Sequence, residues 1–450
     1  MAHQLAEAHP DLATALYLVN KWIRKRIHDT HQPGLAVGIV YDGELLWGEA
    51  YGQADVADGT SLTLDTRFRI ASITKTFTAV AMLQLYEQGK LRFDDPVSNY
   101  LDWFNLHYAD APPITLYHLL THTSGLPRDA TVPHWTEDRF QTWAELVETT
   151  QEREPVAPPL QRFGYSNLGY SLLGGVIEVV SGQPWADYVQ AHILEPLDMR
   201  DTIPTPMGDE PNLATGYLRY DDAYERAAAP FVETKGFSAS ASFASSVNDL
   251  VKYARLHLGK EPFLLSDYSL RDMHRPHWVN EDWQGGYGLG SDISRVNGVT
   301  LSGHTGGYKG YLTAFSLCRE HSVGVIVLSN SINSDPFGYV EHIYKWVLPE
   351  VLKATGKDKP EPDVAWQRYT GTYKGDWGEV MVVIRNKQLE MISLDDMDMP
   401  SAVLEPTGEA HTFRCDERGN PVEMVRFELG DDGSVVRLWN RSEYLRREDD

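Results

Sequence analysis

The sequence predicts an α+β domain followed by a small all-β domain, and three observations support this fold class. Strand-like segments occur near both ends of residues 1–355, so we expect one antiparallel sheet that contains both chain ends. The middle of this region has helical rather than strand patterns and is predicted to be a helical insertion. Beyond residue 365, short strand-like runs alternate with turn residues at regular spacing, which is typical of a small β-barrel or sandwich.

The first predicted element is an amphipathic helix over residues 11–27. Its apolar residues recur at helical spacing: Leu12, Leu16, Val19, Ile23 and Ile27. A hairpin should follow, because apolar runs at 35–41 and 44–50 are separated by Asp42 and Gly43, a strong signal for a tight turn.

The later elements of this domain are predicted from caps and apolar runs. A helix through residues 76–85 should stop at Gly89, and Ser246 should cap a helix over 247–258 that ends at Gly259. Asn297 and Gly298 predict a turn before a short strand at 299–301. Two further strands are expected at 311–318 and 323–329, and a helix at 339–353 should cover the sheet.

Domain boundaries follow from composition. A chain of 450 residues exceeds the size that one core usually serves, so two domains are expected. Residues 354–362 are polar and proline-containing, as linkers are. We therefore predict a catalytic domain at 1–355, a linker at 356–365 and a small β-barrel domain at 366–450. Turns in the barrel are predicted at 386–387, 418–420 and 431–433, beside a strand at 379–385.

Composition excludes several classes of function. The formal net charge is -24, which disfavours binding to nucleic acid because phosphates require clusters of Lys and Arg. No apolar stretch is long enough to span a bilayer, and the N-terminus lacks the basic and apolar pattern of a secretory signal. Only Cys318 and Cys415 occur, in different predicted domains, so no disulfide framework is expected. These observations predict a cytoplasmic protein with no membrane or nucleic-acid partner; the oligomeric state stays open.

The segment Ser72-Ile73-Thr74-Lys75 carries the strongest chemical signal. Residues three apart share a helix face, so the Lys75 amine can reach the Ser72 hydroxyl and accept its proton if the amine is neutral. Apolar neighbours should partly bury Lys75 and lower its pKa, since burial disfavours the ammonium form. A bare S-x-x-K pattern also arises by chance, and an ordinary helix start is the simpler explanation when the pattern is taken alone.

Two later segments raise the probability of a catalytic site. Tyr165 and Asn167 supply a phenol that can relay protons and an amide that can hold the lysine. His304, Thr305 and Gly306 follow a predicted turn and strand, where small residues allow a substrate to lie against the strand edge.

With these three segments in this order, the chain resembles the serine β-lactamase and penicillin-binding-protein superfamily, in its class C-like branch. Ser72 and Lys75 match the first motif of that superfamily, Tyr165 and Asn167 match the second, and His304 begins the third. Residues 116–126 and 287–290 are similar to further hallmarks of the branch, and the resemblance covers about residues 10 to 350. It implies a transpeptidase-like antiparallel sheet with helices on both faces. Several members also carry a lipocalin-like barrel, and residues 369–373 resemble the segment with which that barrel begins.

The resemblance also implies roles for individual residues. Ser72 would attack a carbonyl, Lys75 and Tyr165 would share the roles of base and acid, and Asn167 would orient the lysine and the substrate. The third motif would shape the far wall, and the backbone N–H groups of Ser72 and Gly307 would form an oxyanion hole. Tyr308 and Tyr311 are further candidates for the substrate pocket. No metal or cofactor is required.

One departure from the family pattern concerns the substrate. The β-lactamases carry lysine where this chain has His304, and a histidine with a pKa near 6.5 attracts a carboxylate more weakly at neutral pH. We therefore expect a serine hydrolase acting on an ester or amide of a small molecule or peptide rather than penicillin hydrolysis. An acyltransferase using the same acyl-enzyme is the alternative, and a non-catalytic binding protein that retains the fold is a third possibility.

Other patterns are given structural interpretations. His118 and His122 are four residues apart, as in some metal sites, but Leu119 stands where a metalloprotease glutamate would be, so packing or capping is expected. The glycines at 286–290 do not have the spacing of a dinucleotide-binding loop.

Overall fold

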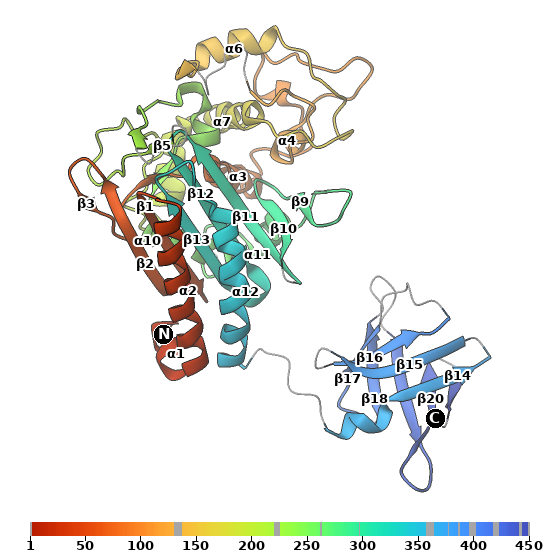
Figure 1. The fold of residues 1–450 in the computed structure, drawn as a ribbon. Helices are drawn as coiled ribbons and strands as arrows, with labels where there is room; N and C mark the ends of the chain where they lie inside the picture. The colour runs from red at the N-terminus through yellow and green to blue at the C-terminus, as the bar shows by residue number, and fades with distance from the viewer. Residues whose placement is uncertain are drawn as a thin grey trace. The chain divides into compact units, whose positions relative to one another are not determined.

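The computed structural model describes eleven segments of the chain, which form two compact units, Met1–Ala354 and Thr355–Asp450 (Figure 1). The described residues are 2–129, 137–219, 226–261, 263–296, 298–356, 364–376, 378–385, 388–395, 402–416, 423–440 and 443–448. Most of the predicted linker, Asn297, and the predicted turns at 386–387 and 418–420 lie outside these residues.

A large antiparallel sheet forms the centre of the first unit. Its strands are β1 (Gly34–Tyr41), β2 (Glu44–Asp55), β3 (Thr60–Ser61), β8 (Trp278–Val279), β9 (Gly285–Tyr287), β10 (Asp292–Val296), β11 (Val299–Tyr308), β12 (Tyr311–Cys318) and β13 (Val323–Ser329). Over the described residues, their spatial order is β3-β2-β1-β13-β12-β11-β10-β9-β8. β1 pairs with β13 from Leu35↔Ser329 to Tyr41↔Val323, so strands from both ends of the unit lie side by side, as predicted.

The hairpin between β1 and β2 has the backbone that its turn residues predict. Asp42 and Gly43 both have positive φ, +53° and +83°. Two successive positive φ values define the type I′ turn, which matches the twist of the adjoining strands. The other short ladders of this unit are β4 (Phe68–Arg69) with β7 (Ala244–Ser245), and β5 (Tyr217–Arg219) with β6 (Arg226–Ala228).

Helices cover both faces of the sheet, as predicted. The helices of the unit are α1 (Ala2–Ala8), α2 (Pro10–Asp29), α3 (Thr74–Glu87), α4 (Leu116–Leu120), α6 (Trp143–Gln151), α7 (Asn167–Ser181), α8 (Trp185–Val189), α9 (Ser238–Ala241), α10 (Val247–His257), α11 (Asp267–His274) and α12 (Pro336–Ala354). Shorter turns are η1 (Ala71–Ile73), η2 (Val97–Asn99), the π-helical η3 (Gln190–Leu194), η4 (Lys235–Phe237) and η5 (Arg319–His321).

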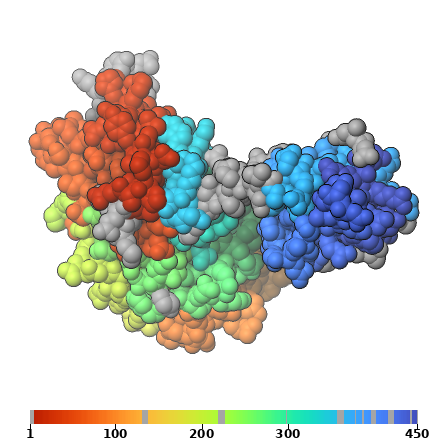
Figure 2. Space-filling model, turned by 90° about the horizontal axis from the view of Figure 1, so that it is seen from below, coloured from red at the N-terminus to blue at the C-terminus, as the bar shows by residue number. Residues whose placement is uncertain are grey.

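One face of the sheet packs against α2 and α12, which lie side by side in Figure 1 and touch in the space-filling view of Figure 2. Trp22 of α2 and Tyr339 of α12 meet edge to face, with ring centroids 5.2 Å apart. Alternate residues of β1 divide between the two faces, because strand side chains alternate: Val37 and Ile39 face these helices, and Ala36 and Val40 face the larger core.

The helical insertion packs on the opposite face around α3. Every residue of α3 from Thr74 to Leu85 is buried, and a helix that is buried all round is a core helix rather than a surface one. The caps predicted for α10 are present: Ser246 Oγ accepts from the Asp249 N–H, and Gly259 has a φ of +73°. Lys75, in the first turn of α3, is therefore held in the core of the unit.

The second unit is a closed barrel, which confirms the all-β prediction for this region. It begins with η6 (Val364–Tyr369), and its strands are β14 (Gly371–Gly375), β15 (Gly378–Arg385), β16 (Gln388–Ser393), β17 (Ala402–Pro406), β18 (Thr412–Asp416), β19 (Glu423–Leu429), β20 (Val435–Asn440) and β21 (Glu443–Arg447). The first strand pairs with the last, Tyr373↔Arg447, which closes the ring. An apolar interior that includes Tyr373 and Phe427 fills the barrel.

Two further observations concern the whole chain. Cys318 and Cys415 are both buried, and they belong to different units. In the part of the chain that the structure describes, no helix has the length and hydropathy to cross a bilayer.

Candidate active site

Ser72 lies in a short helical turn rather than in a regular α-helix. It belongs to η1, and α3 begins two residues later at Thr74. The preceding Ala71 is buried and has a φ of +47°, a left-handed conformation that costs a non-glycine residue roughly 1–2 kcal/mol. The Ser72 side chain stays partly accessible. The backbone thus presents the hydroxyl at the start of a buried helix.

Lys75 is completely buried, which is rare for lysine. Its Nζ lies 2.7 Å from Asn167 Oδ1, 2.9 Å from the Ser240 carbonyl oxygen and 3.2 Å from Ser72 Oγ. A neutral amine has two N–H donors and one lone pair. Asn167 and Ser240 can accept the two N–H groups, so the lone pair remains for the Ser72 hydroxyl.

The environment of Lys75 favours this neutral form. Burial lowers the pKa of Lys75 well below its usual value, and the carboxylate of Asp129 opposes that shift without overcoming it. The sequence predicted partial burial, but the structure buries the amine fully. The depressed pKa therefore comes from desolvation, in the direction predicted.

Asn167 connects the lysine to an acidic residue that the sequence analysis missed. It is the first residue of α7, whose N-cap Ser166 accepts from the Gly169 N–H at 2.9 Å. Its Nδ2 donates to Asp129 Oδ1 at 2.7 Å, while Oδ1 accepts from Lys75. Because a carboxylate only accepts, Asp129 fixes the amide orientation that presents the oxygen to the lysine.

Tyr165 lies beside the same amine. Lys75 Nζ is 4.8 Å from the centroid of its ring. Its hydroxyl is shielded from solvent, and the Ser72 hydroxyl is the group that most lowers its pKa. Burial outweighs Ser72 and raises the pKa of Tyr165 above its usual value. The phenol is therefore protonated at neutral pH. A charged Lys75 would instead have stabilised the phenolate form.

His304 is buried on β11 next to an acidic side chain. Its Nδ1 donates to the Thr305 carbonyl oxygen at 2.6 Å, which leaves Nε2 to accept from the Tyr287 hydroxyl at 3.2 Å. Asp292 Oδ2 is 3.7 Å from Nδ1. Burial lowers the pKa of His304, with Asp292 acting in the opposite direction. The ring is thus neutral at pH 7, and this wall of the site carries a carboxylate rather than a fixed cation.

The residues after His304 differ in what they contact. Thr305 and Gly307 are exposed, whereas Gly306 is buried against the segment that leads to Ser72. A Cβ at Gly306 would lie 2.2 Å from the Ile70 carbonyl oxygen, so only glycine allows β11 to approach so closely. Tyr308 instead donates to the Val232 carbonyl oxygen at 2.8 Å and lines a different cavity from His304.

A cavity of about 290 Å³ adjoins the third motif. His304 and Thr305 line it together with Phe163 and Asp292. Its wall therefore combines an aromatic ring with one carboxylate, and it offers space for part of a small substrate beside the candidate site.

His122 packs against the ring of Tyr165. It is fully buried, and its Nδ1 accepts from the Ser166 N–H at 3.0 Å. Its ring centroid is 4.3 Å from that of Tyr165. His118 caps α4 by accepting from the Thr115 N–H, so the predicted packing and capping roles of the two histidines are confirmed. Within the described residues no group of three or more potential metal ligands occurs.

The structure brings Ser72, Lys75, Tyr165 and Asn167 into direct proximity, and His304 approaches with its ring centroid 6.0 Å from that of Tyr165. Sequence reasoning missed Asp129, Ser240 and Asp292. Asp129 lies three residues after the segment 116–126 that resembled a family hallmark, which was a usable signal. Ser240 acts through its carbonyl oxygen, so its residue type carried none.

Comparisons with known proteins agree with this arrangement. The β-lactamase family model matches residues 19–350. The chain is 26% identical over 421 residues to β-lactamase-like protein 2 of Dictyostelium discoideum, covering 86% of this chain and 76% of that protein. It is 28% identical over 321 residues to protein Flp of Staphylococcus aureus (strain MW2), covering 70% of this chain and spanning 62% of the relative's length.

Two solved structures are also similar. The octameric penicillin-binding protein homologue from Pyrococcus abyssi is 26% identical with a TM-score of 0.67, and the match covers 96% of this chain and 99% of that one. A D-stereospecific amidohydrolase from Streptomyces sp. is 26% identical with a TM-score of 0.59, covering 70% of this chain and 94% of the other.

Proposed function

The chain belongs to the β-lactamase family, and we propose that it is a serine hydrolase that cleaves an ester or amide of a small molecule or peptide through an acyl-enzyme on Ser72. The observation that carries the proposal is the buried amine of Lys75, 3.2 Å from Ser72 Oγ, with both of its other contacts made to acceptors. A fully buried lysine held in this way has the properties of a general base.

In the proposed acylation step, Lys75 Nζ takes the Ser72 proton as Oγ attacks the substrate carbonyl carbon. The carbonyl π-bond opens to an oxyanion, which the backbone N–H groups of Ser72 and Gly307 would stabilise. Collapse of this intermediate breaks the ester or amide bond. The leaving oxygen or nitrogen then receives a proton, and the acyl group remains on Ser72 until water, activated by the same base, releases it as an acid.

Tyr165 is suited to the acid half of this cycle. Burial keeps its phenol protonated, so it can donate to the leaving group and recover the proton from Lys75. The lysine nitrogen lies 4.8 Å from the centroid of the tyrosine ring, so the two groups share one buried site. The lowered pKa of Lys75 therefore suits a base, and the raised pKa of Tyr165 suits an acid.

The electrostatics near His304 bear on the substrate. A neutral imidazole with Asp292 at 3.7 Å gives no fixed positive charge to a carboxylate beside the scissile bond. Substrates that are uncharged at this position fit the site better than penicillin-like acids. The amidohydrolase relative is consistent with cleavage of an amide.

Covalent labelling tests the proposal. A fluorophosphonate probe followed by peptide mass spectrometry should place one adduct on Ser72, and Ser72→Ala should abolish it with little change in melting temperature. Ser240→Ala is the matched control, because it keeps the carbonyl that contacts Lys75 and should retain labelling. Absence of an adduct on a folded wild-type sample would refute the proposal. Adding acceptor alcohols to a thioester assay would separate hydrolysis from acyl transfer.

A further inference from the structure

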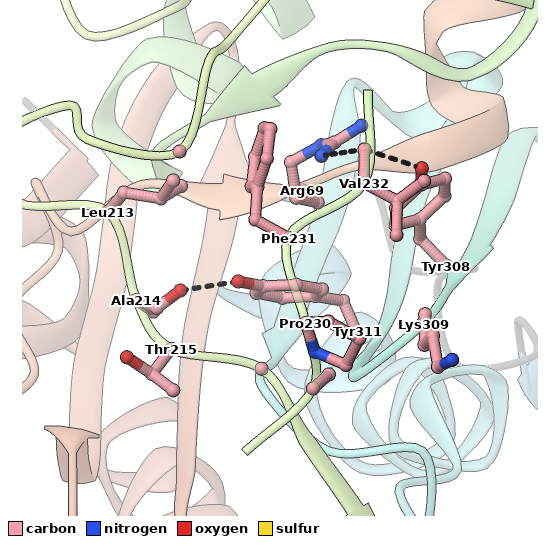
Figure 3. Close-up of a pocket in the computed structure, with 13 residues that line it drawn as sticks. Arg69, Leu213, Ala214, Thr215, Pro230, Phe231, Val232, Tyr308, Lys309 and Tyr311 are labelled. Atoms are coloured by element: carbon pink, nitrogen blue, oxygen red, sulfur yellow. Dashed lines mark hydrogen bonds between the residues drawn. The ribbon is translucent and has the colours of Figure 1, made fainter. Parts of the chain in front are cut away.

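Arg69 is a buried cation that the proposed chemistry does not use. It ends β4, three residues before Ser72, and its side chain is 1% exposed. It lines a cavity of about 100 Å³ together with Phe231, Val232, Tyr308 and Lys309 (Figure 3). One of its lining residues, Tyr308, directly follows Gly307 at the end of the third motif.

One edge of the Arg69 guanidinium has no hydrogen-bond partner among the residues that the structure describes. Nη1 donates to the Val232 carbonyl oxygen at 3.2 Å, and this carbonyl also accepts from the Tyr308 hydroxyl (Figure 3). Nε and Nη2 are shielded from solvent and make no hydrogen bond with a described residue. These two nitrogens form the side-on edge of the planar guanidinium, whose two parallel N–H groups match two oxygens of a carboxylate or phosphate.

The surroundings compensate only part of the charge. The Arg69 Cζ lies 4.2 Å from the centroid of the Tyr308 ring and 4.9 Å from that of Phe231, so aromatic faces stabilise the cation. No residue that lines the cavity in the described part of the chain is acidic. Lys309, the other cation of the lining, is already paired with Asp138. A buried charge without a counter-ion is unfavourable, and an anion would complete this environment.

We propose that the cavity is a binding site for a small oxyanion, held side-on by Nε and Nη2 of Arg69. Phe231 is 37% exposed, whereas Tyr308, the other ring on the guanidinium, is 5% exposed, so an anion would enter past Phe231. Arg69 is three residues before Ser72, and Tyr308 directly follows Gly307, so the cavity is close in sequence to both segments of the proposed catalytic site. The anion therefore has two possible sources. It is either a free ion or the acid end of an acyl group bound at the catalytic serine.

The first arm of the test measures binding alone and does not depend on the proposed function. Inorganic phosphate and succinate at ten times their dissociation constant should each raise the melting temperature of the full chain by about 2 °C relative to sodium chloride of equal ionic strength, if the free ion is the source. Arg69→Met should lose this rise. Arg67→Met is the matched control, because Arg67 already pairs with Asp201 at 2.8 Å, and it should keep the rise.

The second arm compares p-nitrophenyl butyrate with p-nitrophenyl hemisuccinate, if the acid group of the substrate is the source. Wild type should prefer the hemisuccinate by at least fivefold in kcat/KM, and Arg69→Met should lose the preference while still hydrolysing the butyrate. Failure with both esters would count against the proposed hydrolase rather than against the anion site, which the first arm decides.

Phe231→Ala keeps the proposal testable if Arg69→Met does not fold. Removing the exposed ring should lower the dissociation constant for phosphate or succinate at least threefold, or increase the hemisuccinate preference by the same factor. Stabilisation that persists in Arg69→Met would place the anion elsewhere and overturn the proposal. So would the absence of any anion effect in both arms for wild type and Phe231→Ala.

Discussion

Replacing Lys75 by methionine should change how the free energy of unfolding depends on pH. In the unfolded chain this lysine binds a proton below a pH of about 10.4. In the folded protein burial lowers its pKa well below that value, so between the two pKa values the unfolded state holds one proton more. The free energy of unfolding of wild type must then rise with pH across this window, and it must stop changing from this source below the folded pKa.

The magnitude follows from one proton. Each pH unit inside the window adds about 1.4 kcal/mol to the stability of wild type relative to Lys75→Met, or about 2.7 kcal/mol between pH 7 and pH 9. The variant also loses its contacts with Asn167 and Ser240, which costs about 1–3 kcal/mol for each acceptor left unpaired. That loss shifts the whole curve without creating a slope. Only the slope therefore reports the protonation of Lys75.

Urea unfolding followed by tryptophan fluorescence at half-unit steps from pH 6 to pH 9.5 measures this difference. The exposed Lys345 on α12 supplies the matched control, and Lys345→Met should run parallel to wild type. The pH at which the wild-type minus Lys75→Met difference becomes flat gives the pKa of the lysine. A difference that is flat across the whole range would mean that Lys75 is charged in the folded protein, and the general-base argument would fail.

Three further predictions concern neighbouring residues. Asn167→Ala should lower kcat/KM by roughly 10- to 100-fold, because it removes one acceptor of Lys75, and an unchanged rate would show that this contact is not needed. His304→Lys should tighten binding of carboxylate-bearing ligands severalfold at pH 8, and adding Asp292→Asn should tighten it further, as measured by inhibition constants; an unchanged constant would exclude an anion contact. Ala71→Gly should preserve or slightly raise the melting temperature, whereas Ala71→Val should lower it, since only glycine tolerates a φ of +47° without strain.

Much of the fold could be predicted because its signals are local. The Asp42 and Gly43 turn, the Ser246 cap and the apolar run of β1 each depend on residues within a few positions of one another. The barrel was predictable for the same reason, since strand spacing and turn residues recur along residues 366–450. The start of α3 was less predictable. The sequence suggested that Ser72 and Lys75 lie on one face of the same helix, whereas in the structure Ser72 belongs to a short turn that precedes the helix.

The candidate site divides in the same way. The hydroxyl proposed as its nucleophile, and the amine, phenol and amide beside it, could be predicted from the sequence alone, because the proposed chemistry requires those residue types and they occur in recognisable motifs. Their protonation was decided by the tertiary structure, since a pKa depends on burial and on charges such as Asp129 that are distant in the chain. The tertiary structure also decided the contact of Lys75 with the Ser240 carbonyl and the edge of Arg69 that has no hydrogen bond to a described residue. Neither could be predicted from residue type, because every residue has a backbone carbonyl and the partners of a side chain are set only when the chain folds.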